Sequence, residues 1–161
     1  VYYLKEEVGT ELYIPTEIEE TKIIGIANNA FFAIYNLTKV IIPSEIKEIG
    51  DRAFYCCKVL ESVELQKGLE KLGASCFENC FELNNIELPD SLLEIGESCF
   101  YQIGFNEIYI PQSVEIIGAY ALPFLDKVYC EVDEQPEEWD KNWNRGRVTF
   151  TNSPVEWGVS R

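Results

Sequence analysis

The stretch LTKVIIPSEIKEIGDRAFYCC, residues 37–57, decides the fold because close copies of it recur along the chain. It opens with alternating apolar residues and then Pro43, a pattern typical of a short β-strand that ends where Pro offers no N–H donor. Similar stretches begin at Val63, Ile86 and Ile108. They share glycines at nearly constant intervals, namely Gly50, Gly73, Gly96 and Gly118.

An earlier unit, LYIPTEIEETKIIGIANNAF from Leu12, fits the same pattern if Ala27 takes the place of the glycine. Ala27 precedes Gly50 by the same interval that separates Gly50 from Gly73. The unit carries extra residues between Pro15 and Ile26, and we expect them to form a surface loop.

Residues at equivalent positions of these units share their chemistry. One strand column contains Ile14, Ile42, Leu65, Leu88, Ile110 and Cys130, and another, two residues earlier, contains Leu12, Val40, Val63, Ile86, Ile108 and Val128. The aromatic column contains Phe31, Phe54, Phe77 and Phe100, followed by Leu122. Such columns predict a solenoid in which each unit buries its apolar face against its neighbours. The segment after each glycine, such as ASCFENC, is too short for a long helix, so one turn of 3₁₀ or α helix is predicted there.

The pattern L-x-x-Φ-x-Φ-P-x-x-Φ-x-x-I-G-x-x-A-F-x-x-C, in which Φ is apolar, resembles the BspA-type leucine-rich repeat over residues 12–143. Its period lies in the leucine-rich-repeat range of about 20–29 residues. The tail VYCEVDEQPEEWDKNW is similar to a terminal element that often follows such arrays. The chain departs from the pattern at Ala27, at Gln66 in place of Pro, and in the shortened last unit ALPFLDKVYC.

The resemblance implies a curved solenoid, frequent on bacterial surfaces and used for adhesion or protein binding, with no catalytic residues and no cofactor. The predicted fold is therefore an α/β-type repeat solenoid, mostly β. We expect a right-handed leucine-rich-repeat superhelix whose short parallel strands are joined by 3₁₀ or α turns.

Three segments are predicted along the chain. They are residues 1–11, an N-terminal capping strand; 12–130, an array of five units of about 23 residues; and 131–161, a C-terminal cap with Trp139, Trp143 and Trp157. Pro136 suits the first position of a helix, which would place Trp139 and Trp143 on one face over the last repeat. RVTF and VEW, residues 147–150 and 155–157, are predicted as further short strands.

Composition and charge argue against several classes of function. The 13 Lys and Arg stand against 28 Asp and Glu, a net charge of −15, whereas nucleic acids and anionic membranes both require a basic surface. His is absent, which excludes Ser-His, Cys-His and His-metal mechanisms. No run of about 18 apolar residues is present, so membrane insertion is not expected. Residues 131–140 hold six acids and no base but lack the spacing of a calcium loop, so no metal is predicted.

Six cysteines require an explanation, and the repeat register supplies one. Positions that accept Ala, Ile or Cys in different units are predicted to be buried, where a free thiol acts as a small apolar group. These cysteines are Cys57, Cys76, Cys80, Cys99 and Cys130. Cys56 falls in a column predicted to face solvent. Disulfides are the alternative, because stacking brings Cys57 near Cys80, and Cys76 near Cys99, at roughly 5 Å.

The outward side of the strands is the candidate binding surface. Its central column contains Tyr13, Ile41, Glu64, Glu87, Tyr109 and Tyr129, and the neighbouring column contains Glu11, Lys39, Ser62, Asn85, Glu107 and Lys127. Glu64 and Glu87 are predicted to stack as like charges, which costs stability and suggests an acidic binding centre beside tyrosines. The alternative is a solvated surface on which the carboxylates splay apart. A second outward ladder is predicted to pair with itself through alternating charges, Lys47 with Glu70, and Glu48 with Lys71 and Glu94.

These features predict a non-enzymatic protein-binding or adhesion module that acts through the concave side of the sheet, where solenoids usually bind. Tyrosines suit such a surface because each offers a large contact area with few rotatable bonds. The charge favours a basic segment of a protein partner. The alternative is a structural spacer or stalk segment of a larger surface protein, without a ligand of its own. The resemblance favours an extracellular or cell-surface location, and because Met is absent even from position 1, we expect a processed or trimmed fragment.

Overall fold

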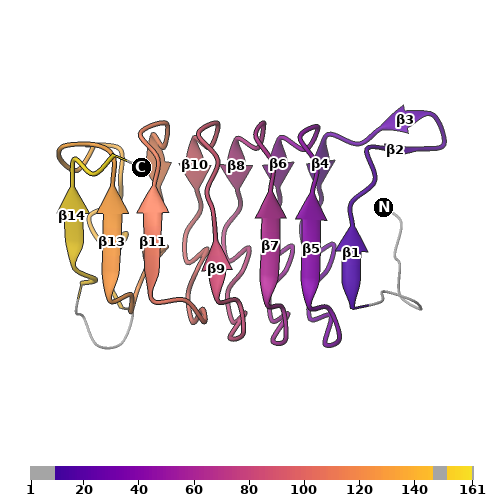
Figure 1. The fold of residues 1–161 in the computed structure, drawn as a ribbon, viewed down its shortest axis with the longest axis horizontal. Helices are drawn as coiled ribbons and strands as arrows, with labels where there is room; N and C mark the ends of the chain where they lie inside the picture. Colours follow the sequence, from indigo (N-terminus) through magenta and orange to yellow (C-terminus); the bar gives the residue numbers. More distant parts are fainter. Residues whose placement is uncertain (1–9, 147–151, 161) are drawn as a thin grey trace.

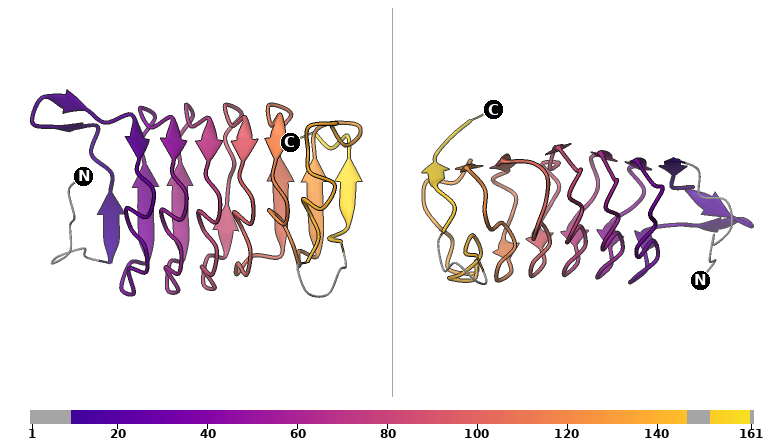
Figure 2. Two further views of the ribbon diagram at one scale, coloured as in Figure 1. Left: turned by 180° about the vertical axis from the view of Figure 1, so that it is seen from behind. Right: turned by 90° about the horizontal axis from the view of Figure 1, so that it is seen from below.

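The computed structural model describes residues 10–146 and 152–160, which form one solenoid of stacked coils (Figure 1). Each coil runs along a strand of the front face, crosses to a short strand on the opposite side and returns through a turn segment (Figure 2). The front-face strands are β1 (Glu11–Tyr13), β5 (Lys39–Ile42), β7 (Ser62–Leu65), β9 (Asn85–Ile86), β11 (Glu107–Ile110), β13 (Lys127–Cys130) and β14 (Val155–Trp157). The short strands, called the back ladder, are β4 (Gly25–Ile26), β6 (Glu48–Ile49), β8 (Lys71–Leu72), β10 (Glu94–Ile95) and β12 (Ile116–Ile117).

Neighbouring coils are parallel and in register. β1 pairs with β5 so that Leu12 lies beside Val40, and β5 pairs with β7 so that Val40 lies beside Val63. The back ladder is also parallel, with Ile49 beside Leu72. All five of these side chains are buried. The strand columns and the parallel stacking predicted from the repeat are therefore confirmed.

The front face is not the single curved sheet that the repeat predicts. It divides into a sheet β1-β5-β7-β9 and a sheet β11-β13-β14. The break coincides with a shortened unit, since Phe77 and Ile86 are nine positions apart but Phe100 and Ile108 are eight. Because side chains alternate along a strand, the loss of one residue disturbs the ladder at this point. Viewed from below, the front strands lie nearly level, so the face predicted to be concave is close to flat (Figure 2).

The extra residues of the first unit form the predicted surface loop, and this loop contains a hairpin. β2 (Glu17–Ile18) and β3 (Thr21–Lys22) pair antiparallel and project at the N-terminal end of the solenoid (Figure 1). The residues between them, Glu19 and Glu20, have φ of 48° and 63°. Two consecutive positive φ angles are the mark of a type I′ turn, which usually contains Asn and Gly. The Glu-Glu sequence therefore carries no hairpin signal.

The segments after the marker glycines are not helical, contrary to the prediction of a 3₁₀ or α turn, and residues 10–146 and 152–160 contain no helix. In the second unit the Phe54 N–H donates to the Cys76 carbonyl of the next coil at 3.0 Å, whereas the Tyr55 N–H donates back to the Arg52 carbonyl at 3.2 Å. A helix would keep all such bonds within its own segment. Instead, alternate N–H groups form a further ladder between coils. The geometry depends on left-handed residues four apart in each coil, namely Asn29 and Ala33, Arg52 and Cys56, Ser75 and Asn79, Ser98 and Gln102, and Tyr120 and Phe124.

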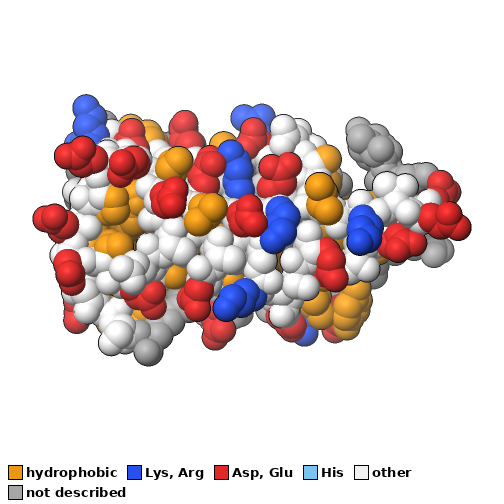
Figure 3. Space-filling model, turned by 90° about the horizontal axis from the view of Figure 1, so that it is seen from above, with side chains coloured by type: hydrophobic (Ala, Val, Ile, Leu, Met, Phe, Trp, Pro, Cys, Tyr) orange, Lys and Arg blue, Asp and Glu red, His pale blue; other side chains and the backbone are white. Residues whose placement is uncertain are grey.

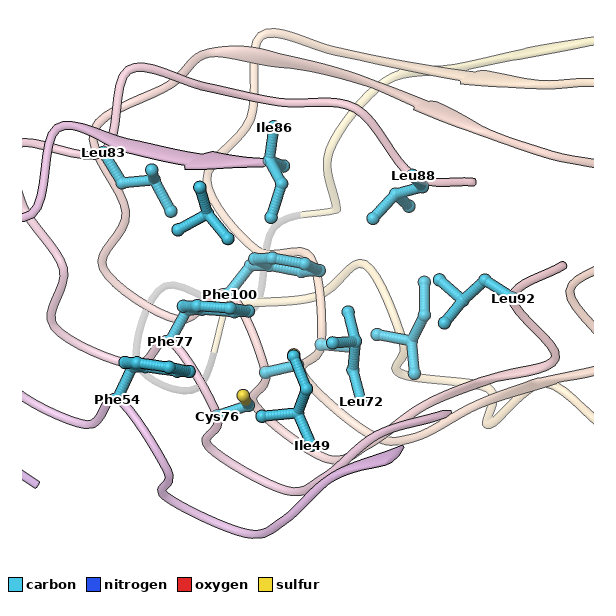
Figure 4. Close-up of a cluster of buried hydrophobic side chains, with 14 of the residues drawn as sticks. Ile49, Phe54, Leu72, Cys76, Phe77, Leu83, Ile86, Leu88, Leu92 and Phe100 are labelled. Atoms are coloured by element: carbon cyan, nitrogen blue, oxygen red, sulfur yellow. The ribbon is translucent and has the colours of Figure 1, made fainter. Parts of the chain in front are cut away.

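The aromatic column forms a stack of rings through the core, part of which is shown in Figure 4. Ring centroids are 5.1 Å apart for Phe31 and Phe54, 5.4 Å for Phe54 and Phe77, and 5.9 Å for Phe77 and Phe100. Three of the rings are fully buried, as predicted, but Phe31 is only partly buried. Phe31 belongs to the first coil, where no described coil covers its outer face.

The marker glycines are required by the close approach of the coils. A Cβ atom on Gly73 would lie 2.6 Å from the Asp51 amide nitrogen of the preceding coil, well inside van der Waals contact. The Asp51 carboxylate also accepts a hydrogen bond from the Ala74 N–H at 2.8 Å, which ties the two coils together. The first unit tolerates Ala27 in place of the glycine because no described coil precedes it.

The C-terminal cap closes the stack without the helix predicted from Pro136. Trp139 and Trp143 are buried over the last repeat, as predicted, and their ring centroids are 5.0 Å apart. Trp139 Nε1 donates to the Val114 carbonyl at 3.3 Å, and the Trp143 carbonyl accepts the Leu122 N–H at 2.9 Å. The cap backbone thus continues the ladder between coils, which a helix could not do.

Further short strands are predicted at the two ends of the chain. VEW forms β14, which pairs with β13. RVTF, and residues 1–9 of the predicted capping strand, lie outside the described residues.

Candidate binding surface

The predicted binding residues share one outward column of the front face, in strand order Tyr13, Ile41, Glu64, Glu87, Tyr109 and Tyr129. Ile41 and Tyr129 are partly buried, and the other four are exposed. The structure brings the column together as two groups, because the break between β9 and β11 separates Glu87 from Tyr109.

Aromatic area is exposed at both ends of the front face. Tyr109 and Tyr129 stack with ring centroids 4.4 Å apart and an interplanar angle of 11°. The Lys127 Nζ lies 5.6 Å from the centroid of the Tyr129 ring. Partial burial raises the pKa of Tyr129, and the negative charge of Glu107 contributes to the same shift. At the other end Tyr13 is 63% exposed.

Two ion pairs neutralise carboxylates on the flanks of the face. The Lys39 Nζ lies 2.6 Å from Glu64 Oε1, and the Lys127 Nζ lies 2.8 Å from Glu156 Oε2. Both pairs are diagonal, because each Lys lies two residues before the position directly opposite its Glu on the next strand. Hydrogen bonding to the carboxylate raises the pKa of both lysines.

This pairing revises the prediction of a stacked acidic pair. Glu64 turns to Lys39 on the preceding strand, and the register of β7 with β9 ends at Val63 and Ile86, one residue before the two carboxylates would face each other. Glu87 makes none of the ion pairs found among the described residues.

A groove that the repeat pattern did not predict lies along the break between β9 and β11. Its volume is about 630 Å³. Residues 84–87 line it from the β9 side, residues 105–109 from the β11 side, and Val159 and Ser160 complete it. These last two belong to the segment that turns back from β14 toward β11 (Figure 1). The shortened spacing between Gly96 and Gly118 is the feature of the sequence from which the groove could have been predicted.

The back side of the solenoid carries the predicted alternation of charge. The Lys47 Nζ lies 3.2 Å from Glu70 Oε1, and the Lys71 Nζ lies 2.8 Å from Glu94 Oε1. Glu48 lies beside Lys71 in the register of the back ladder. From above, acidic and basic side chains are interspersed over the middle of the molecule, and acidic ones dominate toward the C-terminal end (Figure 3). On the back side, Lys47 and Lys71 thus each pair with a glutamate of the next coil.

The cysteines occupy the positions that the repeat register predicts. Five are buried, Cys56 is partly exposed, and all six are free thiols. Burial raises the pKa of Cys57 to about 11 and that of Cys130 to about 12. The Cys57 and Cys80 thiols each donate a hydrogen bond to a main-chain carbonyl of the preceding coil at 3.2 Å. Protonated thiols of this kind fill the core and are poor nucleophiles.

Aromatic side chains are also exposed, fully or in part, on the turn side, and the repeat columns did not predict them. Phe32 stacks on Tyr55 with ring centroids 5.2 Å apart, and Tyr101 meets Phe124 edge to face at 5.7 Å. Phe32, Tyr55 and Tyr101 each directly follow a phenylalanine of the buried column, so the signal was present in the sequence.

The acidic segment 131–140 forms part of the cap surface. Glu131 accepts a hydrogen bond from the Gln112 N–H at 2.9 Å, so its carboxylate links the cap to the last repeat. Among residues 10–146 and 152–160, no three His, Cys, Asp or Glu side chains are grouped so that they could hold a metal ion. The same residues include no helix of the length and apolarity that crossing a bilayer requires.

Parallel coils that repeat at one nearly constant length, marked by glycines at their closest approach and filled by a phenylalanine stack, define a leucine-rich-repeat solenoid. The BspA type leucine rich repeat region matches residues 10–127 in six copies, one more than the five units delimited from the sequence. The chain therefore belongs to the BspA-type leucine-rich repeat family. No curated protein matches it.

Solved structures of bacterial leucine-rich repeat proteins share the fold. The T. pallidum leucine-rich repeat protein is 31% identical, with a TM-score of 0.70 over 75% of this chain and 58% of that one. A leucine-rich repeat protein from Bacteroides ovatus is 29% identical, with a TM-score of 0.69 over 80% of this chain and 34% of that one. A leucine-rich cell surface protein from Faecalibacterium prausnitzii shares the fold at 21% identity and a TM-score of 0.50, over 83% of this chain and 50% of that one. This chain thus spans between about a third and three fifths of the length of these three proteins.

Proposed function

We propose that this chain is a non-enzymatic protein-binding module whose partner docks on the front face. The repeat family is generally used for protein binding, which supports the class of function. The front face is chosen because Tyr109 and Tyr129 stack on each other along its outward strand column. Rigid aromatic rings of this kind give a large contact area and lose little side-chain entropy on binding.

A cell-surface location and a role in adhesion belong to the same proposal. The support is the family and the F. prausnitzii relative, which is described as a cell surface protein. A module of this kind needs a solvent-exposed face that its own structure leaves uncovered, and Tyr13 at 63% exposure fits that requirement.

The test is capture of a partner from host or bacterial surface extracts, followed by binding measurements on the purified pair. Tyr13→Ala/Tyr129→Ala is expected to weaken binding by tenfold or more while the far-UV circular dichroism spectrum of the fold is retained. The matched control, Tyr35→Ala/Phe81→Ala, removes two exposed aromatic rings outside the predicted binding column and should bind as the parent does. If the control loses binding and the front-face variant retains it, the front face is not the site. If extracts yield no partner at all, the spacer alternative gains support.

A further inference from the structure

The groove between β9 and β11 is lined by two carboxylates that form none of the four ion pairs among the described residues. Glu87 lines it from one side and Glu107 from the other, and no Lys or Arg is among the residues that line it. Lys127 lies directly beside Glu107 in the register of β11 with β13, but its Nζ pairs with Glu156 Oε2 at 2.8 Å. The site is therefore acidic in a place where the flanking surface is neutralised.

The register explains why these two carboxylates differ from their neighbours. A Lys in the neighbouring outward column reaches the Glu that lies diagonally across on the next strand, as Lys39 reaches Glu64. The same diagonal starts at Ser62 for Glu87, and it leads from Glu107 to Tyr129 instead of to a cation. A neutral residue thus stands on the diagonal of each carboxylate, and Lys127, the cation beside Glu107, is engaged by Glu156.

The shape of the groove and its aromatic wall restrict the occupant further. Successive residues in and next to β9 and β11 line it, so it extends along the strands for about 10–13 Å, the length of three or four extended residues. Tyr109 stacks on Tyr129, lines the groove and is 39% exposed, so part of its ring is accessible to an occupant. A guanidinium stacks well on such a ring and pairs with carboxylates through several donors.

We infer that this groove binds an extended, arginine-containing segment of a protein partner, with a guanidinium held between Glu87 and Glu107 over the Tyr109 ring. The inference rests on the proposed function of the front face and names the chemistry of its partner. The net charge of −15 attracts any basic peptide. The test therefore has to distinguish binding in this groove from attraction by the electrostatic field of the whole chain.

The probe is an acetylated and amidated heptapeptide of alternating arginine and threonine, titrated into the ¹⁵N-labelled chain. Amide shifts are expected to concentrate on residues 84–87 and 105–109. Glu87→Gln/Glu107→Gln should weaken binding by tenfold or more. The control Glu45→Gln/Glu115→Gln removes the same charge from exposed carboxylates outside the groove and should change affinity less than twofold. The same peptide with glutamate in place of arginine should produce no shifts.

The inference is overturned if the control weakens binding as much as the groove variant does, if the shifts centre on the acidic segment 131–140, or if the arginine peptide does not bind. The captured partner separates the two proposals. If Tyr13→Ala/Tyr129→Ala weakens its binding while Glu87→Gln/Glu107→Gln does not, the front face remains the binding site and the arginine groove falls. If neither variant has an effect, both fall.

Discussion

Replacing Phe77 with Ala tests the phenylalanine stack at its centre. Phe77 is fully buried, between Phe54 at 5.4 Å and Phe100 at 5.9 Å. Truncating a buried Phe costs about 3–5 kcal/mol through lost transfer free energy and the cavity left behind. Each stacked ring pair adds about 0.5–1.5 kcal/mol beyond burial, and Phe77 loses two of them. We expect Phe77→Ala to lower the free energy of unfolding by about 4–5 kcal/mol, at the upper end of the range for a buried aromatic.

The matched variant is Phe31→Ala, at the end of the same stack. Phe31 is partly buried and contacts one stacked ring, so its loss should cost roughly 2 kcal/mol less. Urea unfolding followed by far-UV circular dichroism measures both variants. Tryptophan fluorescence reports the cap separately, because Trp139, Trp143 and Trp157 are the three tryptophans of the chain. Equal costs for the two variants, or a cost for Phe77→Ala that falls below the usual range for a buried aromatic, would refute the argument from stacking.

Two further predictions concern backbone approach and alkaline stability. Gly73→Ala should lower the free energy of unfolding by about 2 kcal/mol or more, because its Cβ would meet backbone at 2.6 Å, whereas Gly25→Ala would meet the flexible Glu48 side chain at 3.1 Å and should be nearly neutral in thermal unfolding. Burial raises the pKa of Cys57 to about 11 and of Cys130 to about 12, from 9.0, so unfolded thiols lose their protons first. The stabilisation is complete below pH 9 and falls as pH rises toward 11–12, by up to about 1.4 kcal/mol per pH unit for each thiol. Urea midpoints between pH 8 and 10 should fall less steeply in Cys57→Ala/Cys130→Val than in the parent, and equal slopes would contradict the assignment.

The repeat determines most of the fold, for a physical reason. A column such as Phe54, Phe77 and Phe100 can be satisfied only if equivalent positions stack, so one register explains many residues together. The same register predicts which cysteines are buried and where alternating charges pair, as Lys71 and Glu94 do. These are properties of the average unit, and the sequence contains several copies of that unit.

A feature that occurs in only one unit, or that depends on backbone conformation, cannot be predicted from the average unit. The turn segments have the length of a single helical turn, but residues such as Arg52 and Cys56 adopt left-handed φ although they are neither Gly nor Asn, the residues that usually indicate it. Glu19 and Glu20 form a hairpin turn that their side chains do not encode. The groove arises from the loss of one residue before Ile108, and its depth depends on how two sheets separate, which composition does not report.

The scarcity of basic residues makes their placement informative about binding. The chain has 13 Lys and Arg, and ion pairs with Glu64 and Glu156 hold Lys39 and Lys127 on the flanks of the front face. The long-range field of the acidic chain accelerates the approach of any basic partner, and salt screens this field within about 8–10 Å. It does not select where the partner docks, because the whole surface contributes to it. Docking position and lifetime depend on contacts at short range. The groove carboxylates beside the exposed Tyr109 ring are therefore expected to act on the dissociation rate, whereas removing distant carboxylates should slow association and leave the bound state unchanged.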